Sequence, residues 1–168
     1  MPIKKWPTAG WSQCAVVAGF AMLAAACGNN TQPAGQQAQE SAPTFQDFGN
    51  YEVHFNALRT DGLTAEVART YGIQRSTNRV MLNVTILHEQ GEHQPRKPVD
   101  GTVQVDAYNL NGQLKSLEMR RVAEGDAIYY IGELSISGTE ILVFDITVTP
   151  TGETAPLKMK FQREFFSG

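Results

Sequence analysis

The sequence predicts a mainly β protein, an antiparallel, immunoglobulin-like β-sandwich of about seven strands with one short helix, from residue 45 onward. Three observations support this fold class. Apolar and polar residues alternate with a period of two in several short segments, Gly- or Pro-containing turns separate these segments, and about seven of them follow one another in one continuous stretch. The Cys…Trp…Cys spacing of true immunoglobulin domains is absent, so only the architecture is predicted.

The alternating segments are the predicted strands. In residues 51–57, Tyr51, Val53 and Phe55 alternate with polar neighbours, as in a strand with one buried face. Residues 80–87 are apolar at most positions and indicate a more fully buried strand. The remaining predicted strands cover residues 99–109, 113–122, 127–134, 140–148 and 157–165. Asn111 and Gly112 give the strongest short hairpin signal, because a type I′ turn needs positive φ at both central positions.

One segment has a helical pattern instead. Residues 63–72 contain good helix formers, a threonine that can cap the first turn, and Gly72 just after the last helical position. We therefore expect a short helix, or a helical crossover, between the first two strands.

The first 26 residues predict a lipoprotein signal peptide. Lys4 and Lys5 precede an uncharged apolar segment, 14–26, which is shorter than the roughly 20 residues that span a bilayer but suits a signal-peptide core. Residues 23–27 (Leu-Ala-Ala-Ala-Cys) resemble a bacterial lipobox, with the leucine one position early. Lipidation of Cys27 is therefore expected, and an ordinary secretory signal with an Ala-x-Ala cleavage site is the alternative.

Residues 27–44 are predicted to form the lipidated N-terminus and a flexible tether, followed by one domain at 45–168. The tether is rich in Gln, Asn, Gly, Ala and Pro, and such a segment cannot bury enough apolar surface to fold. Gly28, rather than Asp, follows Cys27, which resembles lipoproteins of the outer membrane. The predicted location is the bacterial cell envelope, lipid-anchored, in the outer membrane and facing the periplasm.

Charge and cysteine content exclude some classes of function. The formal net charge is −3, and it becomes −5 when the first 26 residues, with their two lysines, are removed. An acidic chain with scattered basic residues lacks the basic patch that binds nucleic acid. Cys14 and Cys27 are the only cysteines, so no disulfide can form within the predicted domain.

Several ordered motifs resemble the bacterial domain-of-unknown-function family 4426, which is found in exported proteobacterial proteins. In this sequence the motifs are residues 46–57, Leu63-Thr64, Val67-Ala68, 71–73, Arg75-Ser76, Asn78-Arg79, Asn109-Leu110, Gly112-Gln113, 127–130, Phe161-Gln162 and Glu164-Phe165. The resemblance covers nearly all of residues 45–166. It implies an envelope location and a β-sandwich, and it transfers no activity.

No catalytic or metal-binding pattern stands out, so no catalytic residue, metal ligand or cofactor is predicted. His88, Glu89, Glu92 and His93 form the only His/Glu cluster. Their spacing is one residue longer than His-Glu-x-x-His, and Gly91 favours a surface loop between strands. There is no Gly-x-Ser-x-Gly elbow, no Walker motif and no dinucleotide fingerprint.

Two segments supply candidate ligand-binding residues. Residues 71–79 bring an aromatic ring, two arginines and an amide into one connection, and arginine recognises carboxylate or phosphate groups with paired hydrogen bonds. The candidates here are Tyr71, Arg75, Asn78 and Arg79. The alternative is that these side chains satisfy backbone groups and nearby acids at the corner. Tyr129 and Tyr130 are also candidates, with one ring expected in the core and the other on the surface.

These observations leave three hypotheses. The leading one is a non-enzymatic envelope lipoprotein, held to the membrane by its lipid, that binds or scaffolds an envelope protein or glycan. The second is an envelope hydrolase or metal-dependent enzyme that uses dispersed acids or the three histidines. The third is a sandwich that binds a small ligand between its sheets or at one end, and a deep pocket beside Arg75 and Arg79 would favour it.

Overall fold

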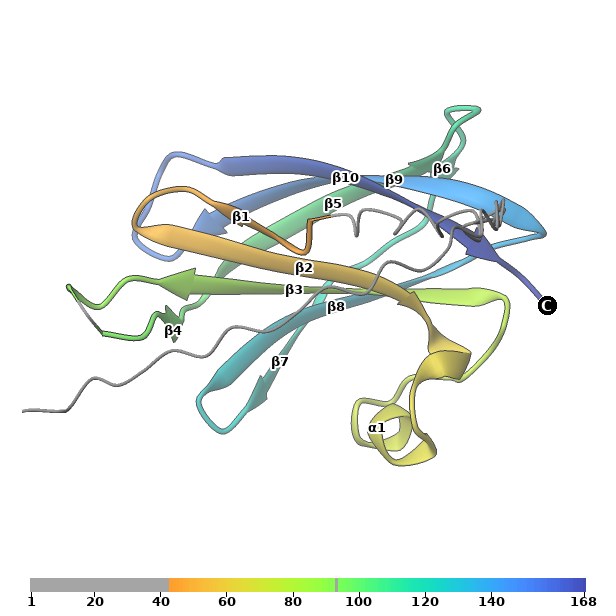
Figure 1. Ribbon diagram of the computed structural model, residues 1–168, viewed down its shortest axis with the longest axis horizontal. Helices are drawn as coiled ribbons and strands as arrows, with labels where there is room; N and C mark the ends of the chain where they lie inside the picture. Colours follow the sequence, from red (N-terminus) through yellow and green to blue (C-terminus); the bar gives the residue numbers. More distant parts are fainter. Residues whose placement is uncertain (1–42, 93) are drawn as a thin grey trace, which may run out of the picture. The chain divides into compact units, whose positions relative to one another are not determined.

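The computed structural model describes residues 43–92 and 94–168 and confirms the predicted fold class, an antiparallel β-sandwich with one short helix (Figure 1). The predicted signal peptide, Cys27, the tether up to residue 42, and His93 lie outside the described residues. No helix in the part of the chain that the structure describes is both long and apolar enough to cross a membrane.

Two sheets form the sandwich. The larger has the strand order β1-β2-β3-β8-β7, with β4 paired to the end of β3, and the smaller has the order β10-β9-β5-β6. The strands of the larger sheet are β1 (Phe45–Asp47), β2 (Tyr51–Arg59), β3 (Arg79–His88), β4 (Lys97–Pro98), β7 (Arg120–Glu124) and β8 (Ala127–Ser135). Those of the smaller are β5 (Gly101–Asn109), β6 (Leu114–Lys115), β9 (Thr139–Pro150) and β10 (Leu157–Phe166).

The core lies between the two sheets, where alternate residues of each strand point inward. Three aromatic rings join the layers: Phe161 on β10 stacks on Phe144 of β9 and on Phe55 of β2, with ring centroids 4.8 and 4.7 Å apart. All three side chains are buried, and burial of each contributes roughly 1.5–3 kcal/mol. The period-two pattern of the sequence therefore sets which residues face the core.

Side chains bridge the sheets along both sides of the sandwich. On one side, Arg163 of β10 bonds to the amide oxygen of Asn56 (2.7 Å) and to the carbonyl of Ala57 on β2. On the other side, the hydroxyl of Tyr130 on β8 lies 2.8 Å from the backbone nitrogen of Gly101 at the start of β5. The sheets thus meet through specific hydrogen bonds as well as through the core.

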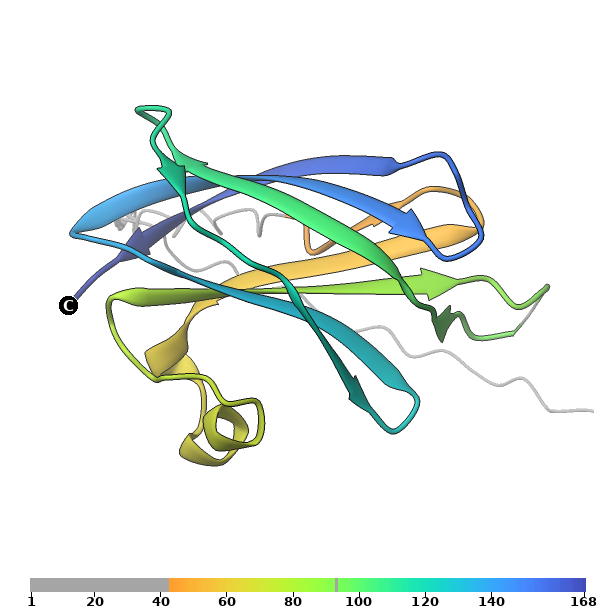
Figure 2. The same ribbon diagram turned by 180° about the vertical axis from the view of Figure 1, so that it is seen from behind.

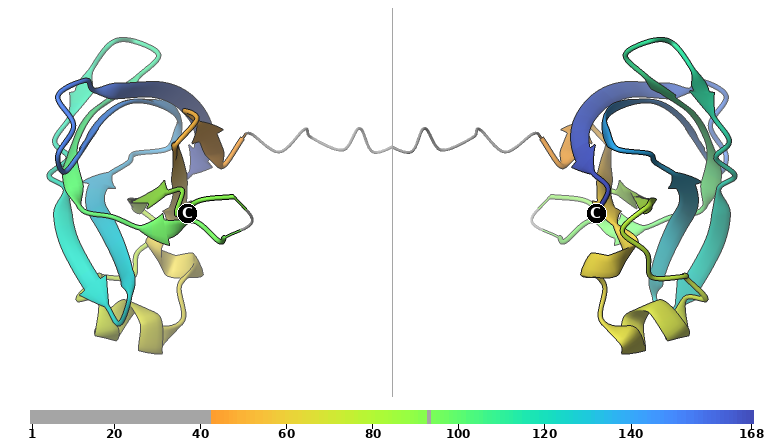
Figure 3. Two further views of the ribbon diagram at one scale, coloured as in Figure 1. Left: turned by 90° about the vertical axis from the view of Figure 1, so that its left-hand side faces the viewer. Right: turned by 90° about the vertical axis from the view of Figure 1, so that its right-hand side faces the viewer.

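The predicted short helix is α1 (Ala65–Thr70), which follows the 3-10 turn η1 (Thr60–Gly62) between β2 and β3. The hydroxyl of Thr64 caps its first turn by accepting a 3.2 Å bond from the nitrogen of Val67. The helix lies outside the larger sheet (Figure 3) and buries Ala68 there.

One predicted strand is wrong in detail. Residues 113–122 do not form a single return strand: β6 pairs with β5 in the smaller sheet, whereas β7 pairs with β8 in the larger one. Leu117 and Met119 of the intervening segment pack against the core, directly over Gly132, where an added Cβ would lie 2.6 Å from both side chains. The chain therefore changes sheets here, because core contacts of the crossing residues replace hairpin pairing. Figure 2 shows this crossing from β6 to β7.

Candidate functional site

The end of α1 positions two residues of the candidate site. The backbone nitrogen of Ile73 bonds to the carbonyl of Ala68 at 2.7 Å, and that of Gly72 bonds to the carbonyl of Arg69 at 3.2 Å. This is the Schellman arrangement, in which the residue at C′ adopts positive φ, and Gly72 has φ +63°. The turn brings Ile73 against the outer face of the larger sheet and leaves Tyr71 at the helix end.

A small apolar pocket lies between this helix end and the sheet, and we call it the tyrosine pocket. It has a volume of about 80 Å³ and is open to the surface. Its lining is apolar and aromatic except for one amide, and consists of Val67, Tyr71, Ile73, Met81, Asn83, Tyr129 and Ile131. The rings of Tyr71 and Tyr129 meet edge to face, with centroids 6.4 Å apart and an interplanar angle of 76°.

Polar contacts fix Tyr71 at the pocket. Its hydroxyl donates a hydrogen bond to Glu124 of β7, and its carbonyl accepts one from the guanidinium of Arg120 on the same strand. The bond to the Glu124 carboxylate, with smaller effects of desolvation and of the Glu124 and Tyr129 charges, raises the pKa of Tyr71 to about 12. Tyr71 therefore stays neutral and oriented at physiological pH.

Asn83 gives the pocket its one polar feature. The residue lies on the outer face of β3, between Asn56 on β2 and Ile131 on β8. Among the described residues, its Oδ1 is the buried side-chain oxygen that has no hydrogen-bond partner. Buried polar atoms in folded proteins almost always have a partner, so this carboxamide oxygen is an exception within the sheet.

The structure does not bring Arg75, Asn78 and Arg79 together with a tyrosine. Arg75 donates a 2.9 Å bond to the carbonyl of Asp61, and Arg79 pairs with Glu133 of β8 at 3.4 Å. These contacts match the structural alternative for the two arginines. These contacts do not support a deep pocket beside Arg75 and Arg79, which would have favoured the third hypothesis, and the ligand-binding role of the two arginines stays a prediction.

The remaining candidates take structural positions. The backbone nitrogen of Asn78 bonds to the hydroxyl of Ser76 at 3.1 Å, which shapes the turn before β3. Tyr130 is buried at 5% exposure and its hydroxyl bonds to Gly101, whereas Tyr129 lies on the outer face. The expectation that the two rings face opposite sides is therefore confirmed. Of the six candidates, Tyr71 and Tyr129 line the tyrosine pocket.

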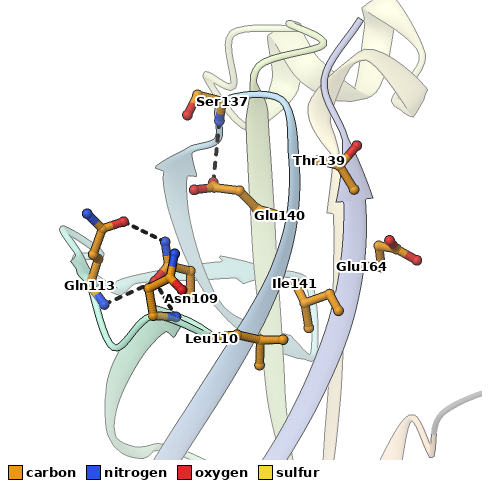
Figure 4. Close-up of a pocket in the computed structure, with 9 residues that line it drawn as sticks. Asn109, Leu110, Gln113, Ser137, Thr139, Glu140, Ile141 and Glu164 are labelled. Carbon is orange, nitrogen blue, oxygen red and sulfur yellow. Dashed lines mark hydrogen bonds between the residues drawn. The ribbon is translucent and has the colours of Figure 1, made fainter.

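A larger and more polar pocket, of about 370 Å³, lies beside the β5–β6 turn (Figure 4). Its amides already bond to one another. Asn109 accepts from the backbone nitrogens of Asn111 (3.1 Å) and Gln113 (3.0 Å), and its amide nitrogen donates to the side-chain oxygen of Gln113 (2.7 Å). We call this the amide pocket, and these bonds shape a turn.

Glu140 of the amide pocket is also internally paired. Its carboxylate accepts bonds of 2.7 and 2.9 Å from the ammonium group of Lys115 and one of 3.3 Å from the nitrogen of Ser137 (Figure 4). Burial opposes ionisation of Glu140, but these hydrogen bonds outweigh it and lower the pKa of the carboxyl. Asn109, Gln113 and Glu140 are therefore held in place within the pocket.

In residues 43–92 and 94–168, no group of three or more His, Cys, Asp or Glu side chains is placed to hold a metal ion. His54 bonds to Glu52 on its own strand, and the ring of His88 lies 4.7 Å from that of Tyr51. The two pockets differ in chemistry, the tyrosine pocket being mainly apolar and the amide pocket mainly polar.

Sequence reasoning missed several residues of these pockets. Met81, Asn83 and Ile131 were interpreted only as positions within strands, although a polar Asn83 between apolar neighbours was a usable signal. Asn109 and Gln113 were identified as residues that flank the Asn-Gly turn and belong to family motifs, not as residues of a pocket. Ile73 reaches the pocket because of the Schellman turn at the end of α1. Gly72 predicts that turn, but the sequence does not show where the turn places the side chain of Ile73.

The comparisons with known proteins give a family and a fold. The family model described as Domain of unknown function (DUF4426) matches residues 45–168. A solved DUF4426 family protein from Pseudomonas aeruginosa PAO1 is 35% identical, covers 76% of this chain and 96% of its own, and superposes with a TM-score of 0.63.

A more distant structure shares the fold alone. It is a copper-bound variant of FetP from uropathogenic Escherichia coli strain F11, 11% identical, with a TM-score of 0.51 over 72% of this chain and 93% of its own. No curated protein matches the sequence.

Proposed function

The chain belongs to the DUF4426 family of domains of unknown function, and we propose that this member is a lipid-anchored, non-enzymatic module of the bacterial cell envelope that binds another envelope protein. The envelope location rests on the predicted signal peptide and on Cys27. A multiply acylated cysteine would hold the chain to the membrane, because each buried CH₂ group contributes about 0.8 kcal/mol.

The observation that carries the binding role is the size and chemistry of the tyrosine pocket. Sites for whole small molecules usually enclose about 300–1,000 Å³, and an apolar cavity of about 150 Å³ holds benzene. A pocket of about 80 Å³ therefore fits a group of a few carbon atoms, such as one aliphatic side chain. Protein interfaces concentrate their affinity in such anchor pockets, often beside tyrosine.

The surroundings of the pocket favour a protein partner over a free metabolite or a glycan. Val67, on its rim, is 38% exposed and presents an apolar surface next to the opening. Asn83 adds one amide to a lining that is otherwise apolar and aromatic. A glycan would need several hydrogen-bonding groups at the site, whereas the tyrosine pocket is lined by apolar and aromatic side chains with one amide.

Site-specific photocrosslinking of the full chain in native membranes tests this proposal. A photoreactive amino acid replaces Thr70, which is exposed and lies one helical turn after Val67. We expect an adduct with a discrete envelope protein, and a more than tenfold loss of that adduct when Val67→Trp blocks the opening. The matched control, Gln104→Trp on an exposed position of β5, should leave the adduct unchanged. An adduct that Val67→Trp does not reduce would contradict the proposal.

Membrane attachment is tested separately. Cys27→Ser should release the chain from the membrane fraction, and mass spectrometry should find acyl chains on Cys27 of the parent. An unmodified Cys27 on the exported protein would contradict the lipid anchor and leave the pocket as an independent question.

A further inference from the structure

The strand β7 is a free edge of the larger sheet. It follows β8 at the end of the order β1-β2-β3-β8-β7 and pairs with no other strand of the described chain. Four of its five residues are exposed, and only Val122 is partly buried. The turn of its hairpin with β8 consists of Gly125 and Asp126 (Figure 2).

The register of this hairpin fixes which backbone groups are unpaired. In an antiparallel ladder, hydrogen-bonded and non-hydrogen-bonded pairs alternate, and the pair that flanks a two-residue turn is hydrogen-bonded. Glu124 and Ala127 flank the turn, and Val122 pairs with Tyr129. The N–H and C=O groups of Arg121 and Ala123 therefore point away from the sheet, and no described residue bonds to them.

The sequence of β7, Arg-Arg-Val-Ala-Glu, is complementary to itself in the antiparallel direction. If Val122 faces Val122 of a second copy, Arg120 faces Glu124 of that copy at both ends. The outward backbone groups of Arg121 then face those of Ala123, which allows four backbone hydrogen bonds. Opposite charges directly across a strand pair stabilise it, and like charges destabilise it.

We infer that β7 is a dimer interface, through which two copies of this chain join their larger sheets across a two-fold axis at Val122. Charged residues on an edge strand usually discourage pairing with other chains. Here they also favour one register. A shift of two residues in one direction would place Arg121 opposite its own copy, and a shift in the other direction would bring the turn residues Gly125 and Asp126 into the ladder. A two-fold interface uses the same patch on both copies, and the symmetry of charges on β7 satisfies that requirement.

The interface is short, so membrane anchoring matters for it. A five-residue strand is a small contact area compared with stable interfaces. Confinement of both copies to one membrane raises their effective concentration and favours weak pairing. This inference goes beyond the proposed function, and its test does not depend on whether the tyrosine pocket binds a partner.

Disulfide trapping in the full chain tests the interface. Residues at a non-hydrogen-bonded antiparallel pair have Cα atoms about 4.5 Å apart, within the range that a disulfide spans. Val122→Cys should therefore yield a dimer that a reducing agent dissociates, above the level of the parent chain. Leu114→Cys, at a residue that is 75% exposed on β6, is the matched control and should yield at least fivefold less.

Two further sets of variants test the register. Ala123→Pro removes an N–H that the β7–β8 ladder does not use, so it should abolish trapping at residue 122 while the domain stays folded. In the Val122→Cys background, Arg120→Glu alone and Glu124→Arg alone each place like charges opposite one another and should reduce trapping at least fivefold.

Co-expression of the two charge variants with different tags should restore the mixed dimer, because opposite charges then face each other again. Restoration also shows that the variants remain folded, although each loses a contact to Tyr71. The inference is overturned if Val122→Cys traps no more dimer than Leu114→Cys, or if the single charge reversals leave trapping unchanged.

Discussion

The hydroxyl of Tyr71 donates a hydrogen bond to the carboxylate of Glu124, which ties the end of α1 to the edge strand β7. The two residues are 53 positions apart in the sequence. Their bond holds the aromatic wall of the tyrosine pocket in place, and it makes the helix end sensitive to the ionisation of Tyr71.

This bond predicts a loss of stability at alkaline pH. The pKa of Tyr71 rises from 10.0 to about 12, chiefly because its neutral hydroxyl donates to Glu124. A folded-state pKa above the unfolded value means that the contribution is complete below about pH 10 and is lost as the pH rises to about 12. The difference in 295 nm absorbance between the parent and Tyr71→Phe should titrate near pH 12, and a midpoint near pH 10 would argue against the bond.

The three-ring stack predicts a large effect of a core substitution. Phe161 is 6% exposed and contacts Phe55 and Phe144 from opposite sheets. Phe161→Ala should lower the free energy of unfolding by about 3–5 kcal/mol, through lost burial and a residual cavity. Urea denaturation measures this change. Phe166→Ala, at a 56% exposed position of the same strand, should change it by less than about 0.5 kcal/mol, and equal effects would contradict the assignment of faces.

Substitutions of the neighbouring residues Tyr129 and Tyr130 should have different effects, one on partner binding and the other on the free energy of unfolding. Tyr130→Phe removes the hydroxyl that meets the nitrogen and carbonyl of Gly101 at 2.8 and 2.9 Å. Loss of a hydrogen-bond partner for such partly buried groups lowers the free energy of unfolding by about 1–3 kcal/mol. Thermal unfolding of Tyr130→Phe and of the parent measures this difference.

Tyr129→Ala instead removes a wall of the tyrosine pocket from the outer face. It should weaken the photocrosslinked adduct, whereas Tyr130→Phe should leave that adduct intact. Loss of the adduct in both variants alike would mean that the adduct reports on stability rather than on the pocket.

The sequence predicted the layers of the fold well because the alternation is local and strong. Val53 and Phe55 point inward as their period-two spacing requires, and Thr64 and Gly72 delimit α1 as their capping preferences indicate. The error in residues 113–122 has a non-local cause, because Leu117 and Met119 pack over Gly132 and carry the chain to the other sheet.

The site was harder to predict than the fold. Tyr71 and Tyr129 were identified as candidates, but Met81 and Ile131 join them only through strand pairing across the larger sheet. Arg75 and Arg79 drew attention as anion-binding groups, yet each bonds to an acceptor near it in space. A single sequence shows which residue types are present and does not show which of them are already paired.

Methyl NMR spectroscopy of the protein shows whether the tyrosine pocket accepts one aliphatic side chain. N-acetyl-leucine-methylamide presents one aliphatic side chain between two amides. Burial of this leucine side chain in the tyrosine pocket should give a dissociation constant of about tens of millimolar. We expect saturable shifts of the methyl groups of Val67, Ile73, Met81 and Ile131 with the leucine compound, and none with the matched serine compound. No shift at these methyls, or equal shifts from the leucine and serine compounds, would contradict this expectation.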